Sequence, residues 1–183
     1  MPIALSAASA AMHGAMVPIA QVPFSNTVVF AFSNIPNKYQ DLMIVVNGVP
    51  NASATTQVID SVNGGISFTG SQTLLSGNGS AASSVRQSGS SNFMPLTQGG
   101  GYQLSATTNS LVIHILNYAN TSTFKTVLWR IASDANGSGN TTLGVGLIQT
   151  TQALSSFNFS TQDIGKYWTS GTATLYGVRS VGQ

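Results

Sequence analysis

The stretch LVIHILNYANTSTFKTVLWRIA, residues 111–132, decides the fold class of this chain. Residues 111–116 are a run of mostly apolar side chains, and residues 126–132 alternate apolar with more polar positions. A period of two is typical of a β-strand, and residues 117–122 have the length of a hairpin loop. Both faces of 111–116 are largely apolar, so we expect this strand to lie in the centre of a sheet and to be covered on both sides.

The same pattern continues on either side of this stretch. No segment after residue 21 keeps apolar residues at helical spacing for three turns, and about eight to ten short strands are expected. The sequence therefore predicts an all-β, jelly-roll-like antiparallel sandwich over residues 22–183. Residues 57–62 and 66–69 flank Asn63-Gly64-Gly65 and are predicted to form a hairpin. Residues 71–110 are rich in Gly and Ser, and we expect short strands there, with long loops that project from one end.

The composition is nearly free of charge. The chain has 6 Lys+Arg and 4 Asp+Glu, so charged residues make up 5% of it, whereas about 25% is usual in a soluble domain. The six cations are scattered, and nucleic-acid binding requires a clustered basic face, so we expect no nucleic-acid partner. The chain has no cysteine, which excludes disulfides and cysteine-based zinc sites.

Residues 1–21 are predicted to form an N-terminal arm, extended or partly helical, that docks on a neighbouring subunit; the alternative is a poorly ordered leader. Its apolar side chains would otherwise be exposed on a nearly uncharged protein. A signal peptide requires a positive residue before its apolar run, and this segment has none. The segment is also too polar to span a bilayer. We therefore expect no membrane partner. The expected assembly contacts of the arm are Ile3, Leu5, Met12, Met16 and Ile19.

The sequence offers little catalytic chemistry. Its four carboxylates stand in turn-like contexts, where Asp usually caps a turn, and a catalytic triad is improbable because His114 has no obvious carboxylate partner. A calcium loop of the EF-hand type needs a closing Glu, which this chain lacks. We therefore expect no enzymatic activity, no cofactor and no metal site. The four carboxylates are those of Asp41, Asp60, Asp134 and Asp163.

Three aromatic residues are candidates for surface contacts. Tyr167 and Trp168 are adjacent, and neighbours on a strand face opposite ways, so one of them is expected to be exposed. An exposed aromatic ring, there or at Tyr118, could stack on a sugar of a host glycan or lie in a protein interface. The alternative is that these rings close the end of the barrel.

Several segments together resemble a known family. They are residues 32–42 (FSNIPNKYQDL), 113–121 (IHILNYANT), 125–127, 134–139 and 175–178 (LYGV). In order and spacing they resemble small β-rich structural modules of tailed bacteriophages, found in tail-fibre and capsid-associated proteins. The resemblance covers roughly residues 28–179.

This resemblance implies a non-enzymatic structural protein of a virion, assembled in the host cytoplasm. The expected role is that of a capsid decoration or cement protein that stabilises the shell through contacts at subunit joints. Its expected partners are the major capsid protein and further copies of itself, as a homotrimer. The alternative is a tail-fibre or tailspike module that binds host surface glycans.

Overall fold

A computed structural model of the chain describes residues 16–53, 55–65, 68–91, 94–97, 104–133 and 139–180. Every element in these ranges is a β-strand, and all strand pairs are antiparallel, which confirms the predicted all-β sandwich. In the described ranges no helix has the length and hydrophobicity needed to cross a bilayer.

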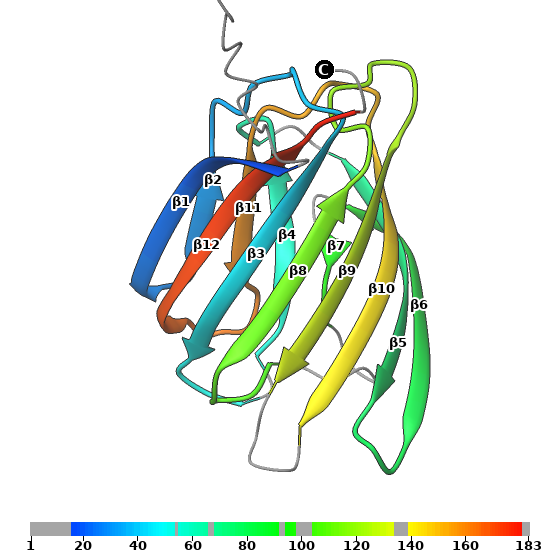
Figure 1. The fold of residues 1–183 in the computed structure, drawn as a ribbon. Helices are drawn as coiled ribbons and strands as arrows, with labels where there is room; N and C mark the ends of the chain where they lie inside the picture. The colour runs from blue at the N-terminus through cyan, green and yellow to red at the C-terminus, as the bar shows by residue number, and fades with distance from the viewer. Residues whose placement is uncertain are drawn as a thin grey trace, which may run out of the picture.

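The strands form two sheets (Figure 1). The larger sheet has eight strands in the order β1-β12-β3-β8-β9-β10-β5-β6, and the smaller has four in the order β2-β11-β4-β7. The strands of the larger sheet are β1 (Met16–Thr27), β12 (Trp168–Val178), β3 (Asp41–Pro50), β8 (Asn109–Ile115), β9 (Lys125–Ser133), β10 (Asn140–Gln149), β5 (Thr69–Gly77) and β6 (Ala82–Ser91). Those of the smaller sheet are β2 (Val29–Phe32), β11 (Phe157–Thr161), β4 (Gln57–Val62) and β7 (Met94–Pro95).

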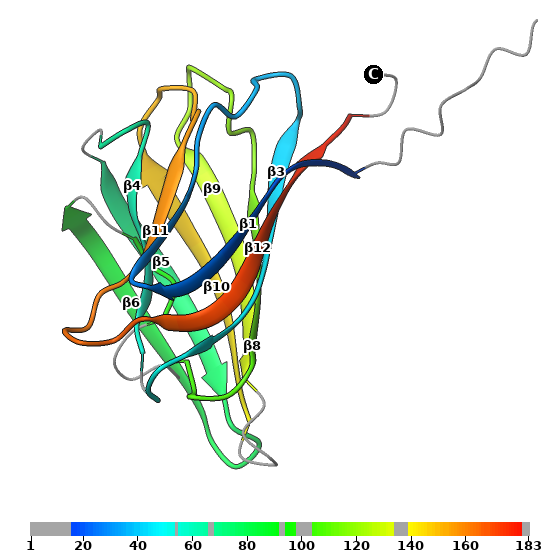
Figure 2. The ribbon, with the colours of Figure 1, turned by 90° about the vertical axis from the view of Figure 1, so that its left-hand side faces the viewer.

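The connectivity is jelly-roll-like because strands from the two ends of the chain pair with each other. β1 pairs with β12, and β2 pairs with β11 in the other sheet. Between these outer pairs, β8, β9 and β10 follow one another as a meander. Met16 lies opposite Val178, so the start of β1 and the end of β12 are side by side (Figure 2).

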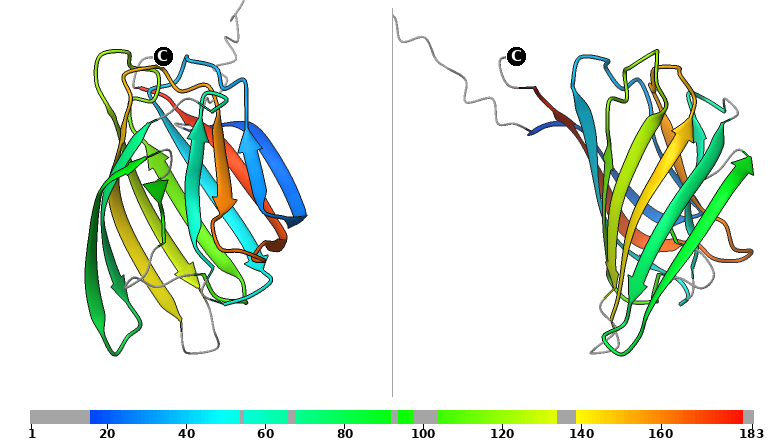
Figure 3. Two further views of the ribbon diagram at one scale, coloured as in Figure 1. Left: turned by 180° about the vertical axis from the view of Figure 1, so that it is seen from behind. Right: turned by 90° about the vertical axis from the view of Figure 1, so that its right-hand side faces the viewer.

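The core lies between the two sheets, because one face of the larger sheet is packed against the smaller one. Seen from behind, the smaller sheet lies over the part of the larger sheet that contains β1, β12 and β3 (Figure 3). β5 and β6, at the other end of the larger sheet, extend past the smaller sheet. Alternate residues of the larger sheet point into this layer, among them Ile44, Leu111, Ile113, Ile115 and Val127, and all are fully buried.

The predicted hairpin around Asn63-Gly64-Gly65 is wrong. β4 belongs to the smaller sheet and β5 to the larger, so the turn carries the chain from one layer to the other. Asn63 has a φ of 50°, and its side-chain oxygen accepts a hydrogen bond from the Ser155 amide at 2.6 Å. The turn residues that suggest a tight hairpin therefore attach this corner to the segment before β11.

The expectation of short strands and long loops after residue 70 is also wrong in its first part. β5 and β6 are nine and ten residues long and form a hairpin at the edge of the larger sheet, with one register shift between Gly70 and Gln72. Its turn is held by Asn78, whose side-chain oxygen accepts hydrogen bonds from the amides of Ser80 and Ala81. Ser-rich strands carry a weak hydrophobic pattern, and this is why the sequence underestimates them.

The expected boundary between arm and sandwich falls inside a strand. β1 begins at Met16 and runs through residues 21 and 22 without interruption, so residues 16–21 are an extended part of the larger sheet. Val17, Ile19 and Val22 pack against the core, so this segment is part of the sandwich. Residues 1–15, with Ile3, Leu5 and Met12, lie outside the described part of the chain.

One cation is fully buried without an acid beside it. The Lys125 ammonium, at the start of β9, donates to the carbonyl oxygens of Thr123 at 2.7 Å and Thr150 at 3.3 Å. No carboxylate of the described residues forms an ion pair with it. Burial disfavours the charged form, so the pKa of Lys125 is lowered from its ordinary value.

This lowered pKa gives a stability that depends on pH. Between the folded pKa and the unfolded value of about 10.4, the unfolded chain binds more protons at residue 125 than the folded chain does. The free energy of unfolding therefore rises with pH in that window. Below the window Lys125 is protonated in both states, so it adds no pH dependence there. Urea unfolding of the wild type and of Lys125→Met, from neutral pH to about pH 10.4, should show the wild type gaining stability relative to the variant as pH rises. A difference that falls with pH would contradict a lowered pKa.

Candidate assembly surface

The larger sheet has an outer face, which is the side turned away from the smaller sheet and toward the viewer in Figure 1. The strand registers align the outward side chains of five neighbouring strands, β3, β8, β9, β10 and β5, in two rows. The first row is Val45, Val112, Arg130, Leu143 and Leu75, and the second is Met43, His114, Leu128, Val145 and Thr73. We call the seven apolar members of these rows the apolar band.

The apolar band is open to solvent. Leu75, Leu143, Val145 and Leu128 are 57%, 51%, 45% and 40% exposed, and no described segment crosses the outer face (Figures 1 and 2). The outward face of an antiparallel sheet in water is normally polar. A contiguous apolar area of this kind marks an interaction surface in a soluble protein.

β8 lies in the centre of the larger sheet, as predicted. Its inner face is fully buried, but Val112 and His114 on the outer face are half-buried, and no described element covers them. We expected β8 to be covered on both faces, but within the described residues only its inner face is covered. A neighbouring molecule on the apolar band would cover the outer face.

The outer face is hollowed around Leu143. One hollow of 380 Å³ has Met43, Val112 and Leu128 in its lining, and another of 550 Å³ is lined by Leu75, Leu143 and residues 82–84 of β6, among others. Both are shallow and open, with Leu143 in the wall of each. Such hollows fit the projecting side chains of a protein surface.

The charges near the apolar band are mainly positive. Arg130 and Arg86 are exposed, and neither forms an ion pair with a carboxylate of the described residues. His114 does have an acidic neighbour, contrary to the sequence prediction, because its Nε2 lies 3.4 Å from Oδ2 of Asp41 at the start of β3. The other Asp41 oxygen accepts the Asn117 amide at 2.7 Å, so this carboxylate also holds the turn after β8.

The other carboxylates provide no cluster for chemistry. Asp163 accepts the Thr56 amide at 2.5 Å, which is a bond to a distant segment and not the predicted cap of its own turn. Asp60 lies within β4 rather than at a turn, which corrects the prediction for that residue, and Asp134 lies outside the described residues. Within the described ranges, no three His or acidic side chains come together as metal ligands would.

Two of the three candidate aromatic contacts are buried, which corrects their assignment to the surface. Trp168 is fully buried, and its Nε1 donates to the side-chain oxygen of Gln57 at 2.9 Å. Tyr118 is also fully buried, and its hydroxyl donates to the Pro36 carbonyl and accepts the Tyr39 amide. Burial raises the pKa of Tyr118. Both rings therefore close the sandwich, which was the alternative reading, and neither can stack on a sugar.

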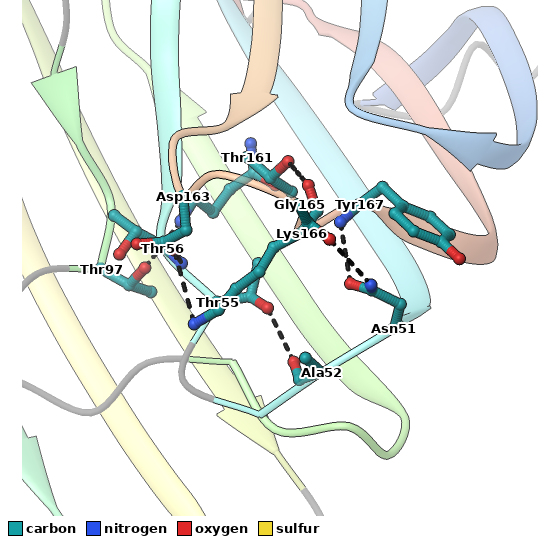
Figure 4. Close-up of polar contacts among 11 residues, drawn as sticks. Asn51, Ala52, Thr55, Thr56, Thr97, Thr161, Asp163, Gly165, Lys166 and Tyr167 are labelled. Carbon is teal, nitrogen blue, oxygen red and sulfur yellow. Dashed lines mark hydrogen bonds and ion pairs between the residues drawn. The ribbon is translucent and has the colours of Figure 1, made fainter.

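Tyr167 is half-buried and belongs to a tightly bonded turn (Figure 4). The Asn51 side chain accepts the Tyr167 amide at 2.9 Å and donates to the Gly165 carbonyl at 3.0 Å. The Tyr167 ring points away from these bonds (Figure 4). The polar groups of the turn thus bind one another. Of the three candidate rings for glycan stacking, only that of Tyr167 remains.

The two described arm residues belong to β1. Met16 is 39% exposed, and Ile19 is half-buried against the core. Because residue 16 is already paired with β12, a deletion that tests the arm has to end at residue 15.

Sequence reasoning missed the apolar band, although β10 carries a signal for it. Leu143-Gly144-Val145-Gly146-Leu147 places every large side chain on one face and glycine on the other. Such a pattern suggests that the apolar face is the core. The glycine face is the inner one instead, since the Trp129 ring lies over Gly144, and the large side chains point outward.

Comparisons with protein-family models, with curated proteins and with solved structures found no match for this chain.

Proposed function

We propose that this chain is a non-enzymatic structural protein of a bacteriophage virion, and that it acts as a capsid decoration or cement protein. In this proposal the outer face of the larger sheet docks on the major capsid protein across a joint between shell subunits. The observation that carries the proposal is the apolar band, two rows of outward side chains with no described layer over them. The low charge of the chain and its resemblance to phage modules support the same role.

The proposed mechanism is the burial of apolar surface. Each 100 Å² removed from water contributes about 2.5 kcal/mol, whereas association costs about 4 to 15 kcal/mol in lost freedom. A docked area of several hundred Å² is therefore needed for each copy. Repetition over a symmetric shell adds avidity to this modest single contact.

The charges on the outer face specify the partner further. Burying a guanidinium without a counter-charge is costly, so a surface that covers the apolar band must place a carboxylate opposite Arg130. Another copy of this chain is poorly equipped for that role. Of the three carboxylates in the described residues, Asp41 accepts the Asn117 amide, Asp163 accepts the Thr56 amide, and Asp60 is half-buried within β4. An acidic patch on a different protein is the better complement.

The decisive variant replaces a cross-strand pair of the apolar band, Leu75→Ser with Leu143→Ser. Both side chains point to solvent in the single chain, so we expect little change in thermal stability. Binding to virions from which the protein has been removed should weaken by at least about 100-fold, because the two most exposed side chains of the apolar band are lost. Cosedimentation or surface binding with the purified particles measures this.

A matched control makes this result specific. Val28 and Ile164 are 51% and 103% exposed and lie away from the outer face, in the connections after β1 and after β11. The double change Val28→Ser with Ile164→Ser removes similar apolar area and should leave particle binding intact. Unchanged binding of the Leu75 and Leu143 variant, or an equal loss in the control, would refute docking through the outer face.

A further inference from the structure

The two long edges of the larger sheet are unequally protected. β1 forms one edge, and its Pro18 and Pro23 lack the N–H that a further strand would need. β6 forms the other edge and has no proline. The edge strands of the smaller sheet, β2 and β7, are four and two residues long and offer little to pair with.

No described strand pairs with the outer edge of β6, and this edge has a defined straight part. Residues 82–87 pair with β5 in unbroken register, and a bulge at Gly89, with a φ of 74°, ends this stretch. The Asn78 amide bonds to the Ala81 carbonyl, which sets the alternation along the hairpin. The backbone N–H and C=O groups of residues 81, 83 and 85 therefore point toward β5. Those of Ala82, Ser84 and Arg86 point away from the sheet.

We propose that β6 pairs antiparallel with β6 of a second copy, about a two-fold axis that passes through Val85. This proposal concerns the edge of the sheet and does not depend on docking through the outer face. In this register Ser84 and Arg86 of the two copies exchange backbone hydrogen bonds, and Ser83 lies opposite Gln87. Strand addition at an open edge is a common mode of protein association.

The side chains of β6 are compatible with a second copy as the occupant, and they select one register for the pair. Arg86 is the one charge on the strand, and a two-fold axis through it would place two guanidinium groups opposite each other. An axis through Ser84 would set Val85 against serine. The axis through Val85 avoids both penalties, because it pairs Val85 with Val85 and gives Arg86 a small polar neighbour, Ser84.

The pairing is closed and leaves the outer faces aligned. After β6 is paired, the remaining long edge is β1 with its two prolines, so association stops at two chains. A two-fold axis perpendicular to the sheet keeps both outer faces on the same side. The pair would then present two apolar bands to one partner surface.

The mass of the full chain in solution is the first test. Sedimentation equilibrium or light scattering should give twice the 18.9 kDa of the chain. Ser84→Pro removes an N–H that points away from β5, so it should convert the pair to a folded single chain, whereas Ser84→Ala should leave the pair intact. A mass of one chain overturns the proposal, and a mass of three chains overturns it in favour of the homotrimer.

A cross-link reports the register itself. The chain has no cysteine, so Val85→Cys introduces one thiol per copy, and antiparallel neighbours at such a position lie within disulfide range. With added diamide as oxidant, Val85→Cys should become a covalent pair within minutes. Val28→Cys, at an exposed site outside β6, should react at least about 10-fold more slowly. Equal cross-linking rates for Val85→Cys and Val28→Cys would overturn the pairing. This test does not depend on whether Ser84→Pro folds.

Discussion

Replacing Gly144 with alanine is expected to lower the free energy of unfolding by about 3 to 5 kcal/mol. A Cβ at this position would lie 2.2 Å from Cε2 of Trp129, which covers the glycine on the inner face of β10. The ring cannot move aside freely, because its Nε1 donates to the Leu96 carbonyl at 2.9 Å. Either the ring is displaced and this buried hydrogen bond is lost, or the strand shifts. Urea unfolding followed by circular dichroism measures the loss.

Gly77→Ala is the matched control for this prediction. Gly77 lies on the neighbouring strand β5, and a Cβ there would meet its nearest atom, the Ala81 carbonyl oxygen, at 3.6 Å. This is ordinary contact, so we expect a change within about 1 kcal/mol. Similar losses in the two variants would mean that the cost arises from backbone freedom in the sheet and not from the Trp129 ring.

Trp168→Ala is expected to cost about 3 to 5 kcal/mol, as large truncations in a core do. The Trp168 ring contacts Phe24 edge-on, with centroids 5.5 Å apart, and Phe24 stacks on Phe30 at 4.8 Å. The truncation therefore opens a cavity in the aromatic cluster that joins the two sheets. It also leaves the buried side-chain oxygen of Gln57 without its donor.

Tyr167→Ala separates the structural from the ligand-binding interpretation of this aromatic pair. Its ring points away from the bonds of the turn, so the change should alter stability by less than about 1 kcal/mol. If Trp168→Ala left stability unchanged and instead reduced adsorption to host cells, the structural role would be refuted. A loss of adsorption in Tyr167→Ala alone would restore the glycan alternative through this one ring.

The fold class could be predicted because the two-residue alternation of apolar and polar side chains in a strand can be read from a short stretch of sequence. The runs 42–46 and 126–132 lie within β3 and β9, and the run 111–116 lies in β8 except for its last residue. The hairpin expected at Asn63 was wrong because turn chemistry specifies a reversal but not which sheet receives the next strand. The length of β5 and β6 was missed because Ser and Thr in these strands give almost no hydrophobic alternation.

The candidate site could be predicted far less well, because it depends on contacts between distant residues. Asp41 reaches His114 only after β3 and β8 pair, and no local pattern joins the two. Tyr118 follows a strand in a polar loop, a position typical of exposed residues, but Pro36 and Tyr39 bind its hydroxyl from another connection. The apolar band likewise forms only when five strands align their outward side chains.

The position of β12 has a consequence for synthesis. This strand, near the end of the described chain, lies between β1 and β3, which come early in the sequence. Until β12 has left the ribosome, β1 has no partner in the larger sheet, and the near side of β3 is an open edge. The sandwich can therefore close only after residues up to 178 have emerged, and folding of this topology is expected to be slow. A cell that makes many copies at once holds a large pool of nascent chains with unpaired strands, so chaperone capacity is expected to limit the yield of folded protein.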